Sequence, residues 1–565
     1  MKLRGLLAFC LWLLAGPLSA EPRQMVAAAH PLAVDAGLKV LEAGGNAMDA
    51  AVAVQMMLGL VEPQASGVGG GGFLLFYDAA TKKITAYDGR ESAPAGATPT
   101  MFMADGKPLP FLQAVASGLS VGVPGAMALL ELAHKEHGVR PWAELFQPVI
   151  AQARAGYPVS PRLAAWLNTI RRFGQEPEAA SLFYDNGAPK KVGDVVVNPA
   201  LADTMQRLAT EGSKALLTGG IAEEIVARVR GHARPGTLSL DDLAHYQVLK
   251  REPVCGPYRI WTICGMGPPS SGGIAILEAL GLLEPFKLYQ DRPNDLRSLH
   301  LIAEASRLAF ADRNEYVGDP AYVKVPVDKM LAPAFLAERR KLISPEKAMS
   351  GGAVEAGYIE HGTSHITIVD RAGNAVSFTT TIEAPFGAEM MVKGFILNNE
   401  LTDFAPRPER DGKPVANRVE PGKRPRSSMS PTFVLNKEGD LVVAVGSAGG
   451  ARIIGDTLQA LIGMLDWNLS PQAALGLPRI LNMNGVTELE DKPELRAQAD
   501  ALRAMGHQIT IRIHEGGLTA IRREADGWSG AADPRRDGVA KGDYRDRGPP
   551  GPHHDHERAW RPAVP

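Results

Sequence analysis

The sequence predicts an α+β protein with a layered core, and three observations lead to this class. Hydrophobic residues make up 45% of the 565 positions, which is enough for one large domain or several smaller ones. Helical spacing of apolar residues dominates the first part of the chain, whereas short β-type runs dominate the centre and the end. Helices and strands do not alternate regularly, so a βαβ architecture is disfavoured.

Two helices and a hairpin are predicted near the N-terminus. Residues 30–44 have Pro31 in the first turn and a glycine pair as a stop signal. Residues 46–60 form an Ala-rich helix that is apolar nearly all round, which predicts burial. The runs 73–77 and 84–88 are typical of the two strands of a hairpin.

The remaining chain has a helical middle and a strand-rich end. After a helix at 121–138, residues 140–250 are mostly helical, and residues 299–313 form a strongly amphipathic helix. Five short strands are then predicted, at 365–370, 375–380, 394–397, 432–435 and 441–445.

The N-terminus has the pattern of an export signal. Lys2 and Arg4 precede the apolar stretch 6–14, and small residues end at Ala20. The stretch is shorter than the roughly 20 residues that span a bilayer, although a buried helix is the alternative. We expect removal of residues 1–20 and a mature chain outside the membrane, in the periplasm in preference to secretion.

Charge and composition exclude several functional classes. Lys and Arg total 60 against 62 Asp and Glu, so the net charge is −2, without the basic excess of a nucleic-acid binder. Three cysteines exclude a disulfide scaffold and a four-cysteine zinc site. The tail 544–565 is rich in Pro, Gly and charge, which predicts disorder. Its cluster His553-His554-Asp555-His556 lacks a folded frame for a metal.

Cys255 and Cys264 lie in two short predicted strands around the turn 256–259. In an oxidising compartment they can form a cross-strand disulfide. Two small buried thiols fit the pattern equally well, so both alternatives stay open.

Two motifs resemble known sites but lack the required context. The glycine run 67–72 matches a dinucleotide fingerprint, yet a helix precedes it and a strand follows, so close backbone packing is the better interpretation. Residues 118–122 place Ser120 in a G-x-S-x-G nucleophile motif without a clear preceding strand, and Pro124 delays the following helix. A serine hydrolase using Ser120 is the most concrete rival enzyme.

Three downstream segments suggest nucleophilic catalysis. Thr363 follows Gly362 and begins an alternating strand. A cut at this threonine would create an α-amine, with a reference pKa of about 7.7–8.0, that can act as base for its hydroxyl. Residues 424–432 form a hydroxyl-rich loop, and Gly449-Gly450 follow a predicted strand, where their N–H groups could hold an oxyanion.

Taken together and in order, these segments resemble the gamma-glutamyltransferases (glutathione hydrolases), which are N-terminal-nucleophile hydrolases. The resemblance covers about residues 25–542. The motifs that support it are 44–54, 63–73, 88–94 (DGRESAP), 268–273, 311–320, 362–379, 398–404 (NNELTDF), 424–432 (RPRSSMSPT), 446–453 (GSAGGARI) and 533–540 (DPRRDGVA).

This resemblance implies a four-layer αββα sandwich built from two pieces of one precursor. Cleavage between Gly362 and Thr363 would give a large subunit, 21–362, and a small catalytic subunit, 363–543, followed by the tail. The two should stay together as a heterodimer because they share one core.

The resemblance also implies the chemistry, which needs no metal or organic cofactor. Thr363 would attack the γ-glutamyl amide of glutathione and form an ester, and water or an amino-acid or peptide acceptor would then take the glutamyl group. Thr381 matches the threonine that hydrogen-bonds the nucleophile, and Gly449 and Gly450 match the oxyanion hole.

A γ-glutamyl head carries a carboxylate and an ammonium on one carbon, so its pocket needs opposite charges side by side. Arg90 with Ser427 and Ser428 matches the carboxylate-binding set, since a guanidinium suits that group. Glu400 and Asp403 match the pair that takes the ammonium.

Two departures from the family pattern affect the expected specificity. Glu383 stands where the family often has Asn, which adds a negative charge near the ammonium. The segment between Asp403 and Ser427 is short and lacks an aromatic residue after Phe404, so we expect a more open pocket. A glutaryl or cephalosporin-type acylase is therefore the main alternative, and a non-enzymatic exported binding protein is a weaker one.

Overall fold

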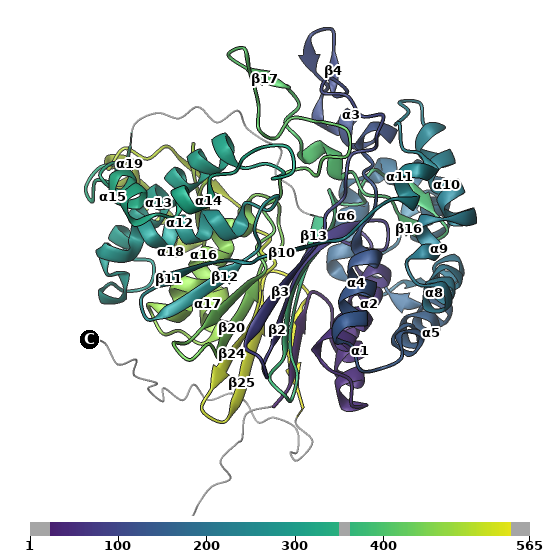
Figure 1. Cartoon of the computed structure of the whole chain (residues 1–565), viewed down its shortest axis with the longest axis horizontal. Coiled ribbons are helices and arrows are strands. Elements are labelled where there is room, and N and C mark those ends of the chain that lie inside the picture. Colours follow the sequence, from purple (N-terminus) through teal and green to yellow (C-terminus); the bar gives the residue numbers. More distant parts are fainter. Residues whose placement is uncertain (1–22, 350–361, 544–565) are drawn as a thin grey trace, which may run out of the picture.

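The computed structural model describes residues 23–349 and 362–543, and its chain forms two stacked sheets with helices outside them (Figure 1). The predicted signal 1–20 and the tail 544–565, with its histidine cluster, lie outside the described residues. Within the described residues, no helix has the length and apolar character needed to cross a membrane.

The first sheet has seven strands, and the predicted cut site lies on a central one. In spatial order they are β10 (Leu249–Arg251), β3 (Lys83–Gly89), β2 (Gly71–Asp78), β14 (Ala375–Glu383), β13 (Gly362–Val369), β1 (Met25–Ala28) and β26 (Val539–Gly542). All neighbours are antiparallel.

The second sheet has six strands and faces the first. In spatial order they are β11 (Val254–Tyr258), β12 (Trp261–Gly265), β19 (Thr432–Leu435), β20 (Leu441–Gly446), β24 (Thr519–Glu524) and β25 (Gly527–Ala532). Each sheet combines strands from before and after position 363, so neither half of the chain completes a sheet alone.

Three apolar cores separate four layers. On one outer face lie α1 (Pro31–Glu42), α2 (Ala47–Val61), α4 (Ala126–His137), α5 (Gln147–Ala155) and α8 (Pro199–Glu211); on the other lie α12 (Gly272–Leu283), α13 (Leu296–Tyr316) and α16 (Arg452–Leu465). Between the sheets, Phe73, Leu75 and Phe433 belong to the third core. The α+β, four-layer class predicted from the sequence is confirmed.

Local signals explain the helix boundaries near the N-terminus. The His30 side chain accepts a hydrogen bond from the Leu32 N–H, and Pro31 begins α1, as the sequence predicts. Asn46 and Asp49 form a reciprocal capping box at the start of α2. Fourteen of the fifteen residues of α2 are buried, so the prediction of an enclosed apolar helix is also confirmed.

Side-chain alternation on β13 and β14 decides which groups face the second sheet. Ile366 and Ile368 pack on the helical side, whereas Thr367 hydrogen-bonds Thr519 of the second sheet at 2.7 Å. Thr363 lies four residues before Thr367 on the same strand, so the two side chains point to the same face of the sheet. Thr363 also pairs directly with Thr381 on β14. Both threonines therefore project between the sheets.

The structure differs from the predicted strands at two places, the turn after Cys255 and the run 394–397. The turn between β11 and β12 comes later than expected, at Arg259 and Ile260, and Arg259 adopts a left-handed φ of 56°. The structure joins Cys255 and Cys264, which are opposite each other on these strands, as a disulfide. The run 394–397 contributes only the two-residue β16 (Phe395–Ile396), paired with β15 (Met391–Val392).

The glycine run 67–72 packs against β14, so its interpretation as a close backbone contact is confirmed. A Cβ on Gly70 would lie 2.0 Å from the Thr381 carbonyl oxygen, and one on Gly72 would lie 2.6 Å from that of Thr379. Only a missing side chain permits this approach. The run thus holds the strand that carries Thr381.

The glycine run supplies a matched pair of substitutions. We expect Gly70→Ala to displace β14 and to lower the yield and melting temperature of the folded protein. Gly67→Ala should be tolerated, because its Cβ would meet only Gly59 Cα at 3.8 Å, an ordinary contact. Thermal unfolding of the two variants checks this, and similar melting temperatures would contradict it.

Candidate active site

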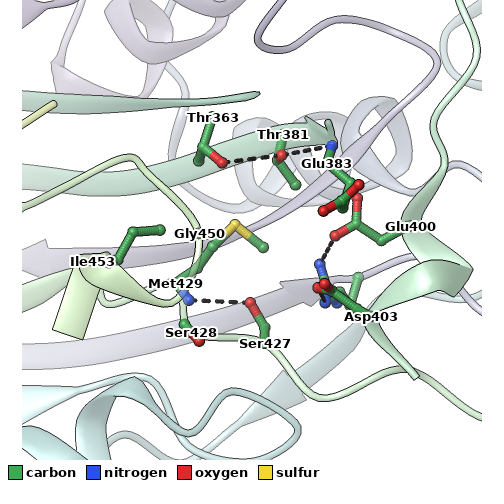
Figure 2. Close-up of a pocket in the computed structure, with 11 residues that line it drawn as sticks. Thr363, Thr381, Glu383, Glu400, Asp403, Ser427, Ser428, Met429, Gly450 and Ile453 are labelled. Atoms are coloured by element: carbon green, nitrogen blue, oxygen red, sulfur yellow. Dashed lines mark hydrogen bonds and ion pairs between the residues drawn. The ribbon is translucent and has the colours of Figure 1, made fainter. Parts of the chain in front are cut away.

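A small polar cavity lies at the N-terminal end of β13, between the sheets (Figure 2). It brings together most of the site residues predicted from the sequence. Its lining consists of Arg90, Thr363, Thr381, Glu383, Glu400, Asp403, Ser427, Ser428, Met429, Gly450 and Ile453.

The two threonines form a directed hydrogen-bond chain (Figure 2). The Thr381 hydroxyl donates to the Gly362 carbonyl at 2.6 Å and accepts from the Glu383 N–H at 2.8 Å. Its single proton is thereby used, so the Thr363 hydroxyl, 3.2 Å away, is the donor in the contact between them. Thr381 thus orients Thr363 and polarises the carbonyl that precedes it.

The backbone is irregular at the predicted cut. Gly362 pairs with Glu383, but Thr363 pairs with Thr381, so the register shifts between the two residues. Glu383 adopts a left-handed φ of 77°, which is uncommon for a non-glycine residue. A Cβ on Gly362 would lie 2.4 Å from the Glu383 carbonyl oxygen, so this position requires glycine. Such irregularities concentrate next to active sites.

Gly449 and Gly450 connect β20 to α16 with φ values of 126° and 61°. These left-handed conformations suit glycine and turn the chain directly into the helix. Within the described part of the chain, neither N–H makes a hydrogen bond. Gly450 lines the cavity, and the positive end of the α16 dipole lies beside it. The arrangement suits a developing oxyanion.

Arg90 is buried between two acidic side chains. Its guanidinium pairs with Glu400 and Asp403, and their side chains are 1%, 1% and 13% exposed. It also donates to the carbonyls of Pro425 at 3.1 Å and Arg426 at 3.0 Å. Burial lowers the pKa of Arg90, but the two carboxylates more than offset this and raise it overall. Arg90 therefore stays a cation.

The Arg90 contacts occupy four of its five N–H donors. This differs from the simple bidentate contact expected from the sequence. A bidentate contact with a substrate carboxylate requires Glu400 or Asp403 to exchange its partner. Within the protein, Arg90 thus already has two carboxylate partners.

Glu91 follows Arg90 in the chain and interacts electrostatically with both Arg90 and Glu400. It was not identified as a site residue from the sequence. Burial raises its pKa well above the ordinary value, and the neighbouring Glu400 charge raises it further. Glu91 therefore carries a proton. Burial also raises the pKa of Glu400, to about 7, although the Arg90 cation opposes this shift. Of these two glutamates, Glu400 is the one that pairs with Arg90. The signal for Glu91 was its position directly after Arg90 in DGRESAP.

The Ser427–Ser428 loop is held by side chains that precede position 363 in the chain. Ser271 donates to the Ser427 carbonyl at 2.6 Å, and Arg313 of α13 donates to the Ser428 hydroxyl at 2.6 Å. Because the Ser428 oxygen accepts from a cation, its own proton remains for an acceptor in the cavity. Sequence reasoning missed Arg313, although it lies within the quoted run 311–320.

Glu383 lies at the same end of the cavity and accepts a hydrogen bond from the Asn399 amide. The segment between Asp403 and Ser427 contains the hairpin β17 (Glu409–Arg410) and β18 (Lys413–Pro414), which projects from the body of the molecule (Figure 1). Among the described residues, the cavity lining includes none from this segment. No aromatic side chain of the segment therefore covers the pocket here.

Ser120 does not have the geometry of a nucleophile. It lies in the 3-10 turn Gly118–Ser120, is fully buried, and donates to the carbonyls of Val115 and Ser117 at 2.8 Å. The short helix α3 (Phe111–Val115), not a strand, precedes it. The serine-hydrolase alternative is therefore wrong.

The described residues contain no group of three or more His, Cys, Asp or Glu side chains arranged to hold a metal ion. His365, two residues after Thr363, is buried, and burial lowers its pKa to about 3. It is neutral, and its Nδ1 contacts Thr379 at 2.9 Å. Reaction without a metal or organic cofactor stays a prediction.

Comparison with known proteins decides the family. The family described as "Gamma-glutamyltranspeptidase" matches residues 33–543. The chain belongs to the gamma-glutamyltranspeptidase family. This confirms the family predicted from the sequence motifs.

Relatives within the family have two kinds of names. The chain is 39% identical to a "Glutathione hydrolase proenzyme" of Bacillus subtilis (strain 168), over 92% of this chain and 91% of the relative. It is 37% identical to an "Acylase ACY 1 proenzyme" of Pseudomonas sp. (strain SE83), over 92% and 93%. A crystal structure of a cephalosporin acylase from Bacillus halodurans matches with a TM-score of 0.83 and 31% identity, over 92% and 96%.

The buried charge set of this gamma-glutamyltranspeptidase predicts a stability effect. We expect Arg90→Met to cost about 3 kcal/mol of unfolding free energy, because Glu400 and Asp403 lose their cation. Arg90→Lys should cost less, since it keeps the charge. Thermal unfolding checks the order, and Arg90→Met/Glu400→Gln should recover part of the loss. A melting temperature unchanged by Arg90→Met would contradict the assigned charges.

Proposed function

We propose that this gamma-glutamyltranspeptidase is an exported, self-processing γ-glutamyl hydrolase and transferase that acts on glutathione and related amides. One observation carries the proposal. A threonine at the start of a strand, hydrogen-bonded to a second threonine, shares a small buried cavity with one guanidinium and three carboxylates. The glutathione hydrolase relatives support the same activity.

Charge balance favours a substrate head that carries an ammonium. Arg90 shares the cavity with the carboxyl groups of Glu383, Glu400 and Asp403, so acidic groups outnumber the cation. A glutamyl carboxylate would contact Arg90 and the hydroxyls of the Ser427–Ser428 loop. Its ammonium would replace Arg90 as the partner of the displaced carboxylate. No buried charge is then left without a partner.

The proposed reaction is acyl transfer through an ester. The Thr363 hydroxyl attacks the γ-carbonyl carbon, and its proton passes to the Thr363 α-amine. The N–H groups of Gly449 and Gly450 stabilise the oxyanion. The leaving amine takes the proton as the amide bond breaks. Water or an acceptor amine then attacks the ester and releases the Thr363 hydroxyl.

The same geometry supports self-cleavage between Gly362 and Thr363. The Thr363 hydroxyl attacks the Gly362 carbonyl carbon while Thr381 donates to its oxygen. The peptide nitrogen leaves as the new α-amine, and an ester joins the two residues. Water hydrolyses this ester and leaves a carboxylate on Gly362 and a free threonine N-terminus.

The two proposed subunits, 21–362 and 363–543 with the tail, would remain associated. Strands β14 and β13 of the small piece lie between β2 and β1 of the large piece. In the second sheet, β12 of the large piece pairs with β19 of the small piece. Separation would break backbone pairing in both sheets and expose all three cores.

The first test targets the threonine pair. We expect Thr363→Ala to give one uncut, inactive chain, because the attacking hydroxyl is lost. Thr381→Ala should slow cleavage by about 100-fold, because it removes the donor to the Gly362 carbonyl oxygen. It should also slow turnover, because Thr363 loses the hydroxyl that orients it. Thr381→Ser should retain most of both. Denaturing gels and N-terminal sequencing of the smaller band follow the cut.

Thr380→Ala is the matched control for this pair. Thr380 is the buried neighbour of Thr381, and its hydroxyl has no hydrogen-bond partner among the described residues. Its loss should leave cleavage and turnover unchanged. Normal processing of Thr363→Ala would refute the cut site.

The second test separates a glutamyl enzyme from the acylase alternative, which the acylase relatives keep open. A glutaryl group lacks the ammonium, so its carboxylate would leave Glu400 or Asp403 buried without a cation. We expect kcat/KM to favour the γ-glutamyl over the glutaryl p-nitroanilide by at least about tenfold, as an unpaired buried charge requires. Asp403→Asn should reduce this preference. A preference for the glutaryl compound would establish the acylase.

A further inference from the structure

The carbonyl of Thr363 is held by a side chain from the far end of the sequence. Arg536 Nη1 donates to it at 2.9 Å. Arg536 lies in the turn between β25 and β26. Strand β1 pairs with Thr367, Ile368 and Val369 of β13, so within residues 23–349 and 362–543 no strand pairs with this side of Thr363. The turn reaches into that space.

The surrounding chain encloses the guanidinium of Arg536 beside the Thr363 carbonyl and fixes the turn that carries it. Its Nε and Nη2 atoms are buried and make no hydrogen bond with any described residue, although the residue as a whole is half-buried. A Cβ on Gly517 would lie 2.9 Å from the Arg536 Cζ, so a glycine makes room for it. Asp533 fixes the turn, since its carbonyl accepts from the Arg536 N–H at 3.1 Å.

The guanidinium remains charged near neutral pH. Burial and then the Arg162 cation lower the pKa of Arg536 to about 9. Arg162 is itself paired with Glu62 at 2.8 Å. Nothing in the proposed mechanism so far uses Arg536, yet it touches the residue that supplies both nucleophile and base.

We propose that Arg536 is a positioning residue for the nucleophile: its guanidinium fixes the Thr363 carbonyl, and its charge favours the neutral form of the Thr363 α-amine. This inference rests on the proposed function, because the amine exists only after the cut. The amine and the carbonyl belong to the same residue, so the cation lies within a few ångströms of the amine. A like charge at that distance disfavours the ammonium form.

Other charged groups also face the amine or Arg536. In the cavity they are Arg90, Glu383, Glu400 and Asp403; around Arg536 they are Glu62, Arg162, Glu515 and Asp533; on β13 the neutral His365 is nearest. The cavity carboxylates oppose the effect of Arg536. Arg90 contributes less because it is paired with two of them.

The test compares the pH dependence of kcat for γ-glutamyl-p-nitroanilide in three variants. Arg536→Met removes the cation, so the amine holds its proton to higher pH, and we expect the acid limb to move up by about one unit. Well below that limb, kcat should fall about tenfold. Arg536→Lys should keep the limb within a few tenths of a unit of the wild type.

Arg371→Met is the matched control, because it removes a cation at the opposite end of β13. Arg371 is 60% exposed and pairs with Asp543. It lies about 25 Å along the strand from Thr363, which is beyond the screening length of ordinary buffer. Its pH profile should coincide with that of the wild type. Coincident acid limbs for Arg536→Met and the wild type would overturn the inference.

A second measurement needs no variant. Competitive acetylation of the wild-type small subunit, followed by mass spectrometry of its N-terminal peptide, gives the pKa of the Thr363 amine. We expect a value below the 7.7–8.0 of an ordinary α-amino group. A value in or above that range would overturn the role of Arg536 while leaving the proposed function intact. Absence of a free Thr363 amine would instead refute the proposed function.

Discussion

The contact on which the rest of the site depends is the pairing of Thr363 with Thr381 across two central strands. Its geometry is set by the backbone register of β13 and β14, which the glycine run 67–72 holds from the other side. A slip of either strand by one residue would turn its own threonine hydroxyl toward the helices. The tightly packed, four-layer core therefore serves to fix two hydroxyl groups and one carbonyl.

The pocket beside these two threonines contains a buried cation that is paired with two carboxyl groups. Arg90 is fully enclosed and pairs with Glu400 and Asp403, so this buried cation is not left without a partner. In the proposed function, a substrate carboxylate would replace Glu400 or Asp403 as the partner of Arg90, and the substrate ammonium would pair with the displaced carboxylate. A zwitterionic head satisfies both sides of this exchange, whereas a head with one charge leaves a partner behind. In the proposed function, a preference for substrates with the ammonium follows from this exchange.

Self-cleavage and catalysis use the same atoms in this scheme. Before the cut, Thr381 polarises the Gly362 carbonyl; after it, the nitrogen of that peptide becomes the base for the next reaction. Both sheets contain strands from before and after the cut, so the new terminus stays where the chain placed it. The base must also be neutral near physiological pH, and the charge of Arg536 would favour this form of the Thr363 α-amine.

The sequence by itself determined the layered α+β class, the family and nearly every residue that lines the cavity. It also predicts the cut between Gly362 and Thr363. Short motifs carry this information, because glycine at close contacts and paired hydroxyl or charged groups are fixed by local chemistry. Tertiary structure decided what no motif contains: that Arg90 is already paired, that Arg313 holds Ser428, and that Arg536 reaches Thr363 across 173 positions. Such contacts depend on register and layer packing, which bring together groups that sequence spacing keeps apart.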